Sequence, residues 1–545
     1  MNWHAVKRQL NGWAILSFLA ILLIVLPGIV VLVELFAPVN DNWQHIQEYL
    51  LPRYVRNTLF IMVATGVLTT VIGTSLAWFV TVYDFPFRRF FKWALILPLA
   101  IPPYIGAYTY HGILNYTGVV QTTLRNQFGI TVDQSYFNIM SIQGTVFIFT
   151  LFLYPYIYTI TRAFLHNQSS SMIENAWILG RGSWDIFFTV VIPISRVAII
   201  GGVSLVLMEV LNDYGVVKYF GIQTFSTAIF STWFGMKDMS SALKLAGTLM
   251  ILVIAILMME RLVRGRKQFS YASTKVKPLK PRPLQGWHRY AVFAYVSLVF
   301  AIAFVIPFTQ LTAWTFLTFD TVFTEEFWQL VWNTVRVAFT ATVIILLFAL
   351  IIANYTRLFP SNMTRVISKV TTLGYSIPGA AIAIAVITLF LWLDDKVLDM
   401  ARALDLSQTF VFRTTLIMLI FAYVIRFLAI GYNSIESGFE KVGKSFTEAS
   451  RMLGWNTVQT FFRVDIPMIK GAIMSAFILV FIDIMKELPL TLFLQPFNFS
   501  TLATQAFKYV SDEKIHEAAL ASIVIVLMSG LLIFVSHKVL DKEAD

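Results

Sequence analysis

The sequence contains no cysteine and little charge. With no cysteine among its 545 residues, the chain cannot form disulfide bonds, zinc–thiolate sites or iron–sulfur clusters, and it cannot use thiol catalysis. Charged residues make up 13% of the chain, whereas soluble globular proteins carry roughly a quarter. Hydrophobic residues make up 57% and form runs long enough to cross a bilayer as helices. The composition therefore predicts an all-α polytopic membrane protein.

The apolar runs predict about twelve transmembrane helices. The first run follows Lys7 and Arg8 as in a signal peptide, but it is too long for one and lacks a small-residue cleavage site. We therefore interpret it as the first span. The twelve predicted spans are 13–36, 57–82, 93–116, 144–165, 196–219, 243–263, 290–316, 332–356, 371–393, 413–433, 470–494 and 516–537.

Lysine and arginine cluster in alternate loops between these spans. Basic residues gather at 88–92, 357–369 and, most densely, 261–289, whereas acidic residues occupy 320–326 and 394–399. By the positive-inside rule, this alternation predicts that both termini and the 261–289 segment are cytoplasmic. The protein is then predicted to cross its membrane several times. Much of the net charge of +11 reports this topology and does not indicate nucleic-acid binding.

The two halves of the chain resemble each other. Asn57-Thr58 recurs as Asn333-Thr334 at an offset of 276, and the segment from Glu174 recurs from Glu448 at an offset of 274. Each half holds six predicted spans, so both halves enter the membrane in the same orientation, as a parallel repeat. The predicted domains are 1–263 and 290–545, two transmembrane halves, joined by a basic, proline-containing cytoplasmic linker at 264–289.

One repeated segment carries a family signature. "ENAWILGRGSWDIFFTVVIP" from Glu174 matches "EASRMLGWNTVQTFFRVDIP" from Glu448. Both resemble the E-A-A-x3-G-x9-I-x-L-P signature of the membrane subunits of binding-protein-dependent ABC importers, although the first copy has Asn175 at its second position. The resemblance implies the type I importer fold, with a short coupling helix in each half that docks on an ATPase. A helix lying on lipid is the alternative interpretation. The residues implied to couple to the ATPase are Glu174, Ala176, Gly180, Pro193, Glu448, Ala449, Gly454 and Pro467.

A second pattern, "GFEKVGKS" at 438–445, fits the Walker A signature G-x-x-x-x-G-K-[ST]. A working phosphate-binding loop needs a preceding strand and a following helix. Here the match follows a predicted span, and the equivalent first-half segment, "FLHNQSSS" at 164–171, has neither glycine nor lysine. We therefore interpret the match as accidental and expect no enzymatic activity in this chain.

Further stretches resemble the fused, two-half permeases of the ferric-iron uptake family. They are 97–110, 209–235 and 483–513. The resemblance implies a location in a bacterial plasma (inner) membrane. It also implies a homodimeric ABC ATPase on the cytoplasmic side, with ATP–Mg bound there and no cofactor on this chain. An extracytoplasmic substrate-binding protein is the other implied partner. Thiamine, phosphonate or polyamine cargo remains open within this architecture. An ion-coupled secondary transporter is the alternative from another class, although the duplicated coupling motif argues against it.

Four acidic residues lie within predicted spans at symmetric positions. Glu209 and Asp213 are spaced i, i+4, and adding 274 reaches Asp483 and Glu487. Ionisable residues inside a membrane usually face the protein interior or a water-filled path, so these acids are predicted to line the translocation path. Glu209 and Asp483 are the candidates for transient contact with a hard cation through oxygen donors.

Alternatives remain open for the other candidates of this path. Asp213 and Glu487 also fit a gate or helix-break role, because glycine or proline follows each within two residues. Several tyrosines fit packing as well as a contribution of phenolic oxygens. They are Tyr104, Tyr108, Tyr110 and Tyr214.

Overall fold

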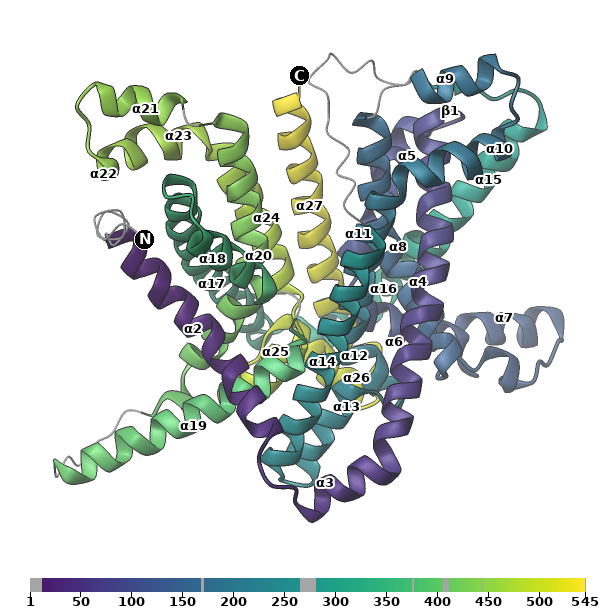
Figure 1. The fold of residues 1–545 in the computed structure, drawn as a ribbon. Helices are drawn as coiled ribbons and strands as arrows, with labels where there is room; N and C mark the ends of the chain where they lie inside the picture. Colours follow the sequence, from purple (N-terminus) through teal and green to yellow (C-terminus); the bar gives the residue numbers. More distant parts are fainter. Residues whose placement is uncertain are drawn as a thin grey trace.

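The computed structural model describes residues 12–167, 171–264, 281–374, 377–404, 411–443 and 445–544. The chain is almost entirely helical (Figure 1). Its one pair of strands in the described residues, β1 (Tyr83–Asp84) and β2 (Arg282–Pro283), is parallel and joins the end of the predicted linker to the first half. The rest of that linker, 265–280, lies outside the described residues.

Each half is an ordered series of helices. Those of the first half are α2 (Gly12–Leu35), α3 (Asp41–His45), η1 (Ile46–Leu50), α4 (Leu51–Val82), α5 (Arg88–Ala94), η2 (Leu97–Ala100), α6 (Pro103–Leu114), α7 (Val119–Phe128), η3 (Gln134–Phe137), α8 (Ile142–Asn167), α9 (Ser171–Ile178), α10 (Ser183–Ile186), η4 (Phe187–Val191), α11 (Ile192–Asn212), α12 (Gly215–Tyr219), α13 (Phe225–Phe230), η5 (Ser231–Gly235) and α14 (Met239–Arg264).

The second half follows the same plan. Its helices are α15 (Trp287–Phe300), η6 (Ala301–Val305), α16 (Ile306–Val322), α17 (Glu325–Leu358), α18 (Asn362–Leu373), α19 (Gly379–Ala403), η8 (Phe412–Thr414), α20 (Leu416–Val442), α21 (Ser445–Met452), α22 (Thr457–Thr460), η9 (Phe461–Asp465), α23 (Ile466–Met468), α24 (Lys470–Met485), α25 (Pro489–Leu494), α26 (Leu502–Ser511) and α27 (Ala518–Ala544).

The described helices confirm a polytopic all-α protein, with fewer continuous spans than predicted. Nine helical segments in the described residues are long and apolar enough to cross a membrane, or eleven if each of two bent pairs counts as one span. The predicted count of twelve is not reached because of the segment 371–393. There α18 ends at Leu373 and α19 begins only at Gly379. The first eighteen residues of α19 already include three charged residues, Asp394, Asp395 and Lys396, so this helix is not apolar enough to count as a span.

Three predicted spans are broken within the membrane region. The span predicted at 93–116 is a pair of helices bent by 91° at Pro102 and Pro103. The span predicted at 196–219 ends as a helix at Asn212, and the one predicted at 470–494 ends at Met485. Proline removes a backbone donor and clashes with the preceding turn, and an acid that caps a new helix favours a break. These breaks place the site described below.

Structural equivalents in the two halves confirm the internal repeat. The Nδ2 of Asn57 donates to the Gln223 carbonyl at 2.9 Å, and the Nδ2 of Asn333 donates to the Ser500 carbonyl at 3.3 Å. Each asparagine thus ties the longest helix of its half, α4 or α17, to the loop before a later short helix, α13 or α26. This shared bond gives a physical reason for the Asn-Thr pair that recurs in the sequence.

The first span of each half, α2 and the continuous segment α15–η6–α16, packs onto the other half. Helix α2 lies against α17 and α19, while α16 lies against α6 as well as α27. The short helices α9 and α10 of one half and α21 and α22 of the other lie at the same end of the molecule, at separate corners (Figure 1). Both ends of the described chain are at that end too, so the halves share one orientation.

Candidate functional site

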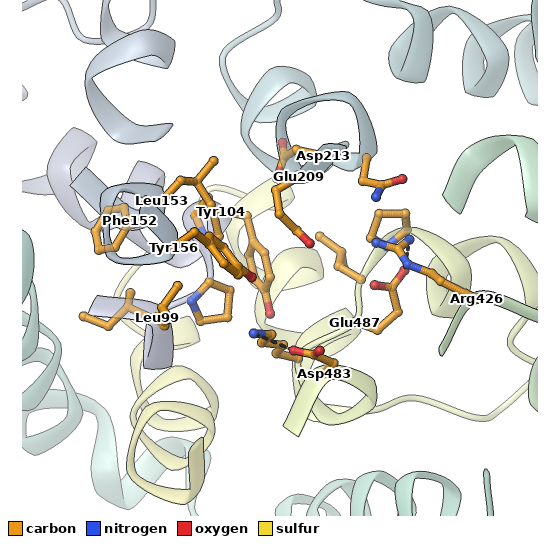
Figure 2. A pocket seen from close by; sticks show the side chains of 18 of the residues that line it. Leu99, Tyr104, Phe152, Leu153, Tyr156, Glu209, Asp213, Arg426, Asp483 and Glu487 are labelled. Atoms are coloured by element: carbon orange, nitrogen blue, oxygen red, sulfur yellow. Dashed lines mark hydrogen bonds and ion pairs between the residues drawn. The ribbon is translucent and has the colours of Figure 1, made fainter. Parts of the chain in front are cut away.

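A cavity of about 80 Å³ lies between the two halves and is lined by all four of the singled-out acids. Glu209 and Asp213 come from the end of α11, and Asp483 and Glu487 come from the end of α24 and the turn after it. Figure 2 shows the two pairs facing the same space from different elements. The structure therefore brings together residues that are 274 positions apart in the sequence.

Two of these acids cap the helices that follow the breaks. The Oδ1 of Asp213 accepts the Val216 backbone N–H at 2.9 Å, and the Oε1 of Glu487 accepts the Leu490 backbone N–H at 3.0 Å. Each bond spans three residues and satisfies a donor in the first turn of α12 or α25. This geometry supports the helix-break role for both acids, because the bond lets a new helix start inside the packed core.

Two cations share the cavity with the acids. The Nζ of Lys486 lies 2.8 Å from the Oδ1 of Asp483. The Nη1 of Arg426, on α20, donates to the Oε1 of Glu487 at 3.2 Å, and both of these side chains are buried. The lining therefore has four carboxylates against two cations, and it carries a net negative formal charge.

Glycines make the close approaches around this cavity possible. A Cβ added to Gly379 would lie 2.1 Å from the Nη1 of Arg426, and one added to Gly215 would lie 2.5 Å from the Cβ of Tyr104. The backbone N–H of Gly379 also donates to the Oδ1 of Asn212 at 3.0 Å, joining the second half to the end of α11. The cavity is thus a tightly packed contact between the halves.

Two tyrosines belong to the lining, and three predicted candidates do not. Tyr104 lines the cavity, as does Tyr156, which the sequence reasoning missed (Figure 2). Tyr108 instead bonds to Ser522 on α27, and Tyr214 packs its ring on Phe230 and Phe493. Tyr110 bonds to the Ile302 carbonyl. The structure therefore places Tyr108, Tyr110 and Tyr214 in packing contacts away from this lining.

Arg426 was also missed, although the sequence held a signal for it. It is a charged residue within the predicted span 413–433, and a charge at that depth indicates a functional or buried polar site. Its pairing with Glu487 could not be read from spacing, because 61 residues separate the two. Tyr156 carries no comparable signal.

The acids do not form a resident metal centre. Within the part of the chain that the structure describes, no group of three or more His, Asp or Glu side chains is arranged to hold a metal ion. A tight oxygen-ligand site for a hard cation gathers several carboxylates around one point. The cavity offers negative charge and oxygen donors on both sides, which suits passing contact better than storage.

The repeated signature folds into two short helices, α9 and α21, with the same ending. Each ends in a Schellman motif: Arg181 N–H donates to the Ala176 carbonyl, and Trp455 N–H donates to the Ser450 carbonyl. The residues before them, Gly180 and Gly454, have φ values of +76° and +88°. That left-handed conformation favours glycine, which explains why glycine recurs here.

Exposed apolar side chains precede both glycines. Ile178 and Leu179 are 82% and 79% exposed, and Met452 and Leu453 are 90% and 79% exposed. Such an apolar pair on a short helix at the end of the molecule is suited to a groove on a partner protein. The sequence reasoning did not single out Ile178, Met452 or Leu453.

The other signature residues support the shape of these helices. Glu174 and Glu448 lie in the first turns of α9 and α21, where a negative charge favours the helix dipole. Ala176 is buried, whereas Ala449 is exposed. Pro193 and Pro467 occupy the first turns of α11 and α23, where proline is tolerated.

The Walker-like segment does not form a phosphate-binding loop. Residues 438–442 are the last part of α20, which begins at Leu416. A Cβ added to Gly438 would lie 2.4 Å from the Cβ of Ala472 on α24, so this glycine serves close helix packing. Lys444 lies outside the described residues.

Comparisons with known proteins agree with this architecture. The family described as "Binding-protein-dependent transport system inner membrane component" matches twice, over residues 70–260 and 345–545. The chain is 26% identical over 488 residues to the Fe(3+)-transport system permease protein FbpB 2 of Haemophilus influenzae, covering 88% of this chain and 89% of that protein.

Two further relatives show the range of the similarity. The ferric transport system permease protein FbpB of Actinobacillus pleuropneumoniae is 22% identical over 92% of this chain and 73% of its own length. The molybdenum transport system permease protein ModB of Escherichia coli is 27% identical, over 26% of this chain and 60% of its own length.

Proposed function

Because the chain belongs to the family of binding-protein-dependent transport system inner membrane components, we propose that it is a permease subunit of an ATP-driven importer for ferric iron. An extracytoplasmic binding protein delivers the cargo, and a separate ATPase supplies the energy. The chain itself performs no covalent chemistry. It provides the path and the two docking elements through which nucleotide-driven motion reaches that path.

The observation that carries the choice of cargo is the carboxylate-lined cavity between the halves. Four acids face two cations there, so the surplus charge favours a cation. Carboxylate and phenol oxygens are hard donors of the kind that a hard cation prefers. Relatives that match most of this chain are also named for Fe(3+) or ferric transport.

The coupling mechanism that we propose uses α9 with α10 and α21 with α22. Two ATPase subunits bind the exposed pairs Ile178–Leu179 and Met452–Leu453. When the ATPases close, the two corners move together and one half rocks against the other. The cavity lies at the contact of the halves, so this motion changes which side of the membrane it faces.

An oxyanion is the second candidate for the cargo. Arg426 and Lys486 line the cavity, and relatives named for molybdenum and sulfate transport match parts of this chain. Both cations already pair with cavity acids, however, at 3.2 and 2.8 Å. Thiamine, phosphonate and polyamine remain further alternatives from the family architecture.

The test is uptake of radiolabelled ferric iron by cells that express this chain with its cognate ATPase and binding protein. We expect uptake that stops when the ATPase is replaced by a hydrolysis-dead variant. Parallel assays with labelled molybdate, sulfate, thiamine, phosphonate and a polyamine serve as controls. Uptake of one of these instead of iron would contradict the cargo, and uptake that survives the dead ATPase would contradict the mechanism.

A further inference from the structure

The two short signature helices are anchored to the membrane helices by different chemistry. In the first half, Ile173 of α9 and Val191 of η4 belong to an apolar cluster with Trp78 of α4. At the equivalent positions of the second half, 274 residues further on, stand Thr447 and Asp465. The fold therefore accepts an apolar anchor here, and the polar one in the second half requires another explanation.

The polar anchor is built around a buried ion pair. The Nη2 of Arg357, at the end of α17, donates to the Oδ2 of Asp465 at 2.7 Å. The Oγ1 of Thr447, on α21, donates to the Oδ1 of the same carboxylate, also at 2.7 Å. Asp465 is 4% exposed. Replacing a buried ion pair by apolar residues is often neutral or stabilising, so stability alone does not account for this pair.

The guanidinium of Arg357 is only partly satisfied. Its side chain is 9% exposed, and its Nε and Nη1 are buried with no hydrogen-bond partner. In the first half the equivalent position is Thr81. A buried charged donor without an acceptor is unfavourable by several kcal/mol in general. An acceptor that binds from outside would remove that penalty.

Arg357 also lines a cavity of about 510 Å³. Arg365 and Lys369, both on α18 and both exposed, add two further cations to the lining. Hydroxyl groups and two acids complete the polar lining, and one of those acids, Glu436, already accepts the Tyr432 hydroxyl at 2.7 Å. The remaining polar lining residues are Thr356, Ser361, Thr364, Ser368 and Glu440.

The first turn of α18 also borders this cavity. Ser361 is the N-cap of that twelve-residue helix, and Ser361, Thr364 and Arg365 all line the space. The Ser361 Oγ already accepts the Thr364 N–H at 3.2 Å, so this helix end contributes the positive end of its dipole, which favours an anion. The helix end and the unsatisfied Arg357 are independent observations that point to the same ligand charge.

We propose that this cavity is a binding site for a phosphate-class oxyanion. Arginine donates paired N–H groups that match tetrahedral oxyanions, and Lys369 adds a flexible point charge. The bound anion pairs with the three cations of the lining, Arg357, Arg365 and Lys369. The Nη2 of Arg357 donates to Asp465, and Asp465 also accepts from Thr447 on α21. The anion therefore contacts the same arginine that anchors α21 through Asp465. Inorganic phosphate and the phosphate headgroup of an anionic lipid share this chemistry.

The test is a titration of the full chain, in nanodiscs of neutral phospholipid, with radiolabelled inorganic phosphate. We expect saturable binding that weakens about tenfold or more in the double variant Arg365→Ala with Lys369→Ala, since two cations of the site are lost. Lys441→Ala is the matched control, because this exposed lysine on α20 does not line the cavity. Equal binding by the wild type, the double variant and the control overturns the proposal. The absence of saturable phosphate binding in the wild type also overturns it.

A second variant tests the role of Arg357 without leaving a charge buried. The triple change Arg357→Thr, Thr447→Ile and Asp465→Val copies the residues of the first half. We expect it to fold with a similar melting temperature and to lose saturable phosphate binding. Retained binding in this variant excludes Arg357 from the site.

The same assay distinguishes the two sources of the phosphate group. In nanodiscs that contain phosphatidylglycerol, competition with phosphate in the wild type but not in the double variant identifies a lipid headgroup as the ligand. Unchanged phosphate binding in those nanodiscs identifies the free anion. None of these measurements depends on which cargo the chain transports.

Discussion

Glu209 and Asp483 differ from Asp213 and Glu487 in what their carboxylates contact. Asp213 and Glu487 each accept a backbone N–H three residues ahead, and so they hold the start of a new helix. Glu209 and Asp483 lie one turn earlier, and both contribute to the cavity lining. The Oδ1 of Asp483 also pairs with the Nζ of Lys486 at 2.8 Å.

The first prediction concerns these two acids. Changing Glu209 to Gln together with Asp483 to Asn removes the surplus negative charge of the lining while conserving volume. We expect ferric uptake to fall about tenfold or more, since the loss of even an outer partner of a metal ligand has effects of roughly 10–100-fold. The measurement is initial uptake rate, with assembly of the permease and ATPase checked by co-purification.

The matched control keeps the charge and exchanges the two acid types. The variant Glu209→Asp with Asp483→Glu should retain most of its uptake, because both carboxylates remain. Normal uptake by the neutral variant would mean that these acids do not act on the cargo.

At the scale of elements, the ending of each of the two signature helices, α9 and α21, is set by one backbone conformation. Gly180 and Gly454 adopt positive φ, and a Cβ added to either would meet no atom within 4 Å. Substitution there acts through backbone strain, with no steric clash to add to it. The broken spans show the same dependence on local chemistry, because α11 and α24 end where a capping acid and then glycine or proline follow.

The second prediction follows from that strain. Changing both Gly180 and Gly454 to Val disfavours the left-handed conformation by roughly 1–2 kcal/mol at each site. We expect the last turns of α9 and α21 to unwind and the exposed pairs beside them to shift. ATP hydrolysis by the complex should then continue while uptake falls several-fold.

Asparagine provides the control for this experiment, because it tolerates the left-handed region. The variant Gly180→Asn with Gly454→Asn should keep most of the coupling between hydrolysis and uptake. Loss of coupling in both variants to the same extent would indicate that the strained conformation is not the cause.

At the scale of the whole molecule, the two halves lie in the same sense, with both described chain ends at the end of the molecule that carries α9 and α21 (Figure 1). Helix α2 of the first half contacts α17 and α19 of the second, and α16 of the second half contacts α6 of the first. The two first spans thus cross the contact between the halves. Rocking of one half against the other must therefore preserve these crossed contacts while it changes the central one.

The third prediction is the orientation of the chain in the membrane. Since the chain has no native cysteine, single cysteines report exposure without background. A membrane-impermeant maleimide should label Phe36→Cys, in the connection from α2 to α3, in intact spheroplasts. Ile178→Cys and Met452→Cys, on the coupling helices, should react only after permeabilisation. The reverse pattern would contradict cytoplasmic coupling helices and termini.

Features that depend on local spacing could be read from the amino acid order alone. The duplicated glutamate–glycine motif, the paired acids around Glu209 and Asp483, and the all-helical membrane class each follow from short patterns repeated at a constant offset. Only the tertiary structure shows that the four acids share one cavity, and that Tyr108 and Tyr214 lie outside it. It also shows that Arg426 pairs with Glu487 and Arg357 with Asp465, partners that are 61 and 108 residues apart. Such pairs depend on how helices from distant parts of the chain pack, and a helix's own residue pattern carries no information about which partner it will meet.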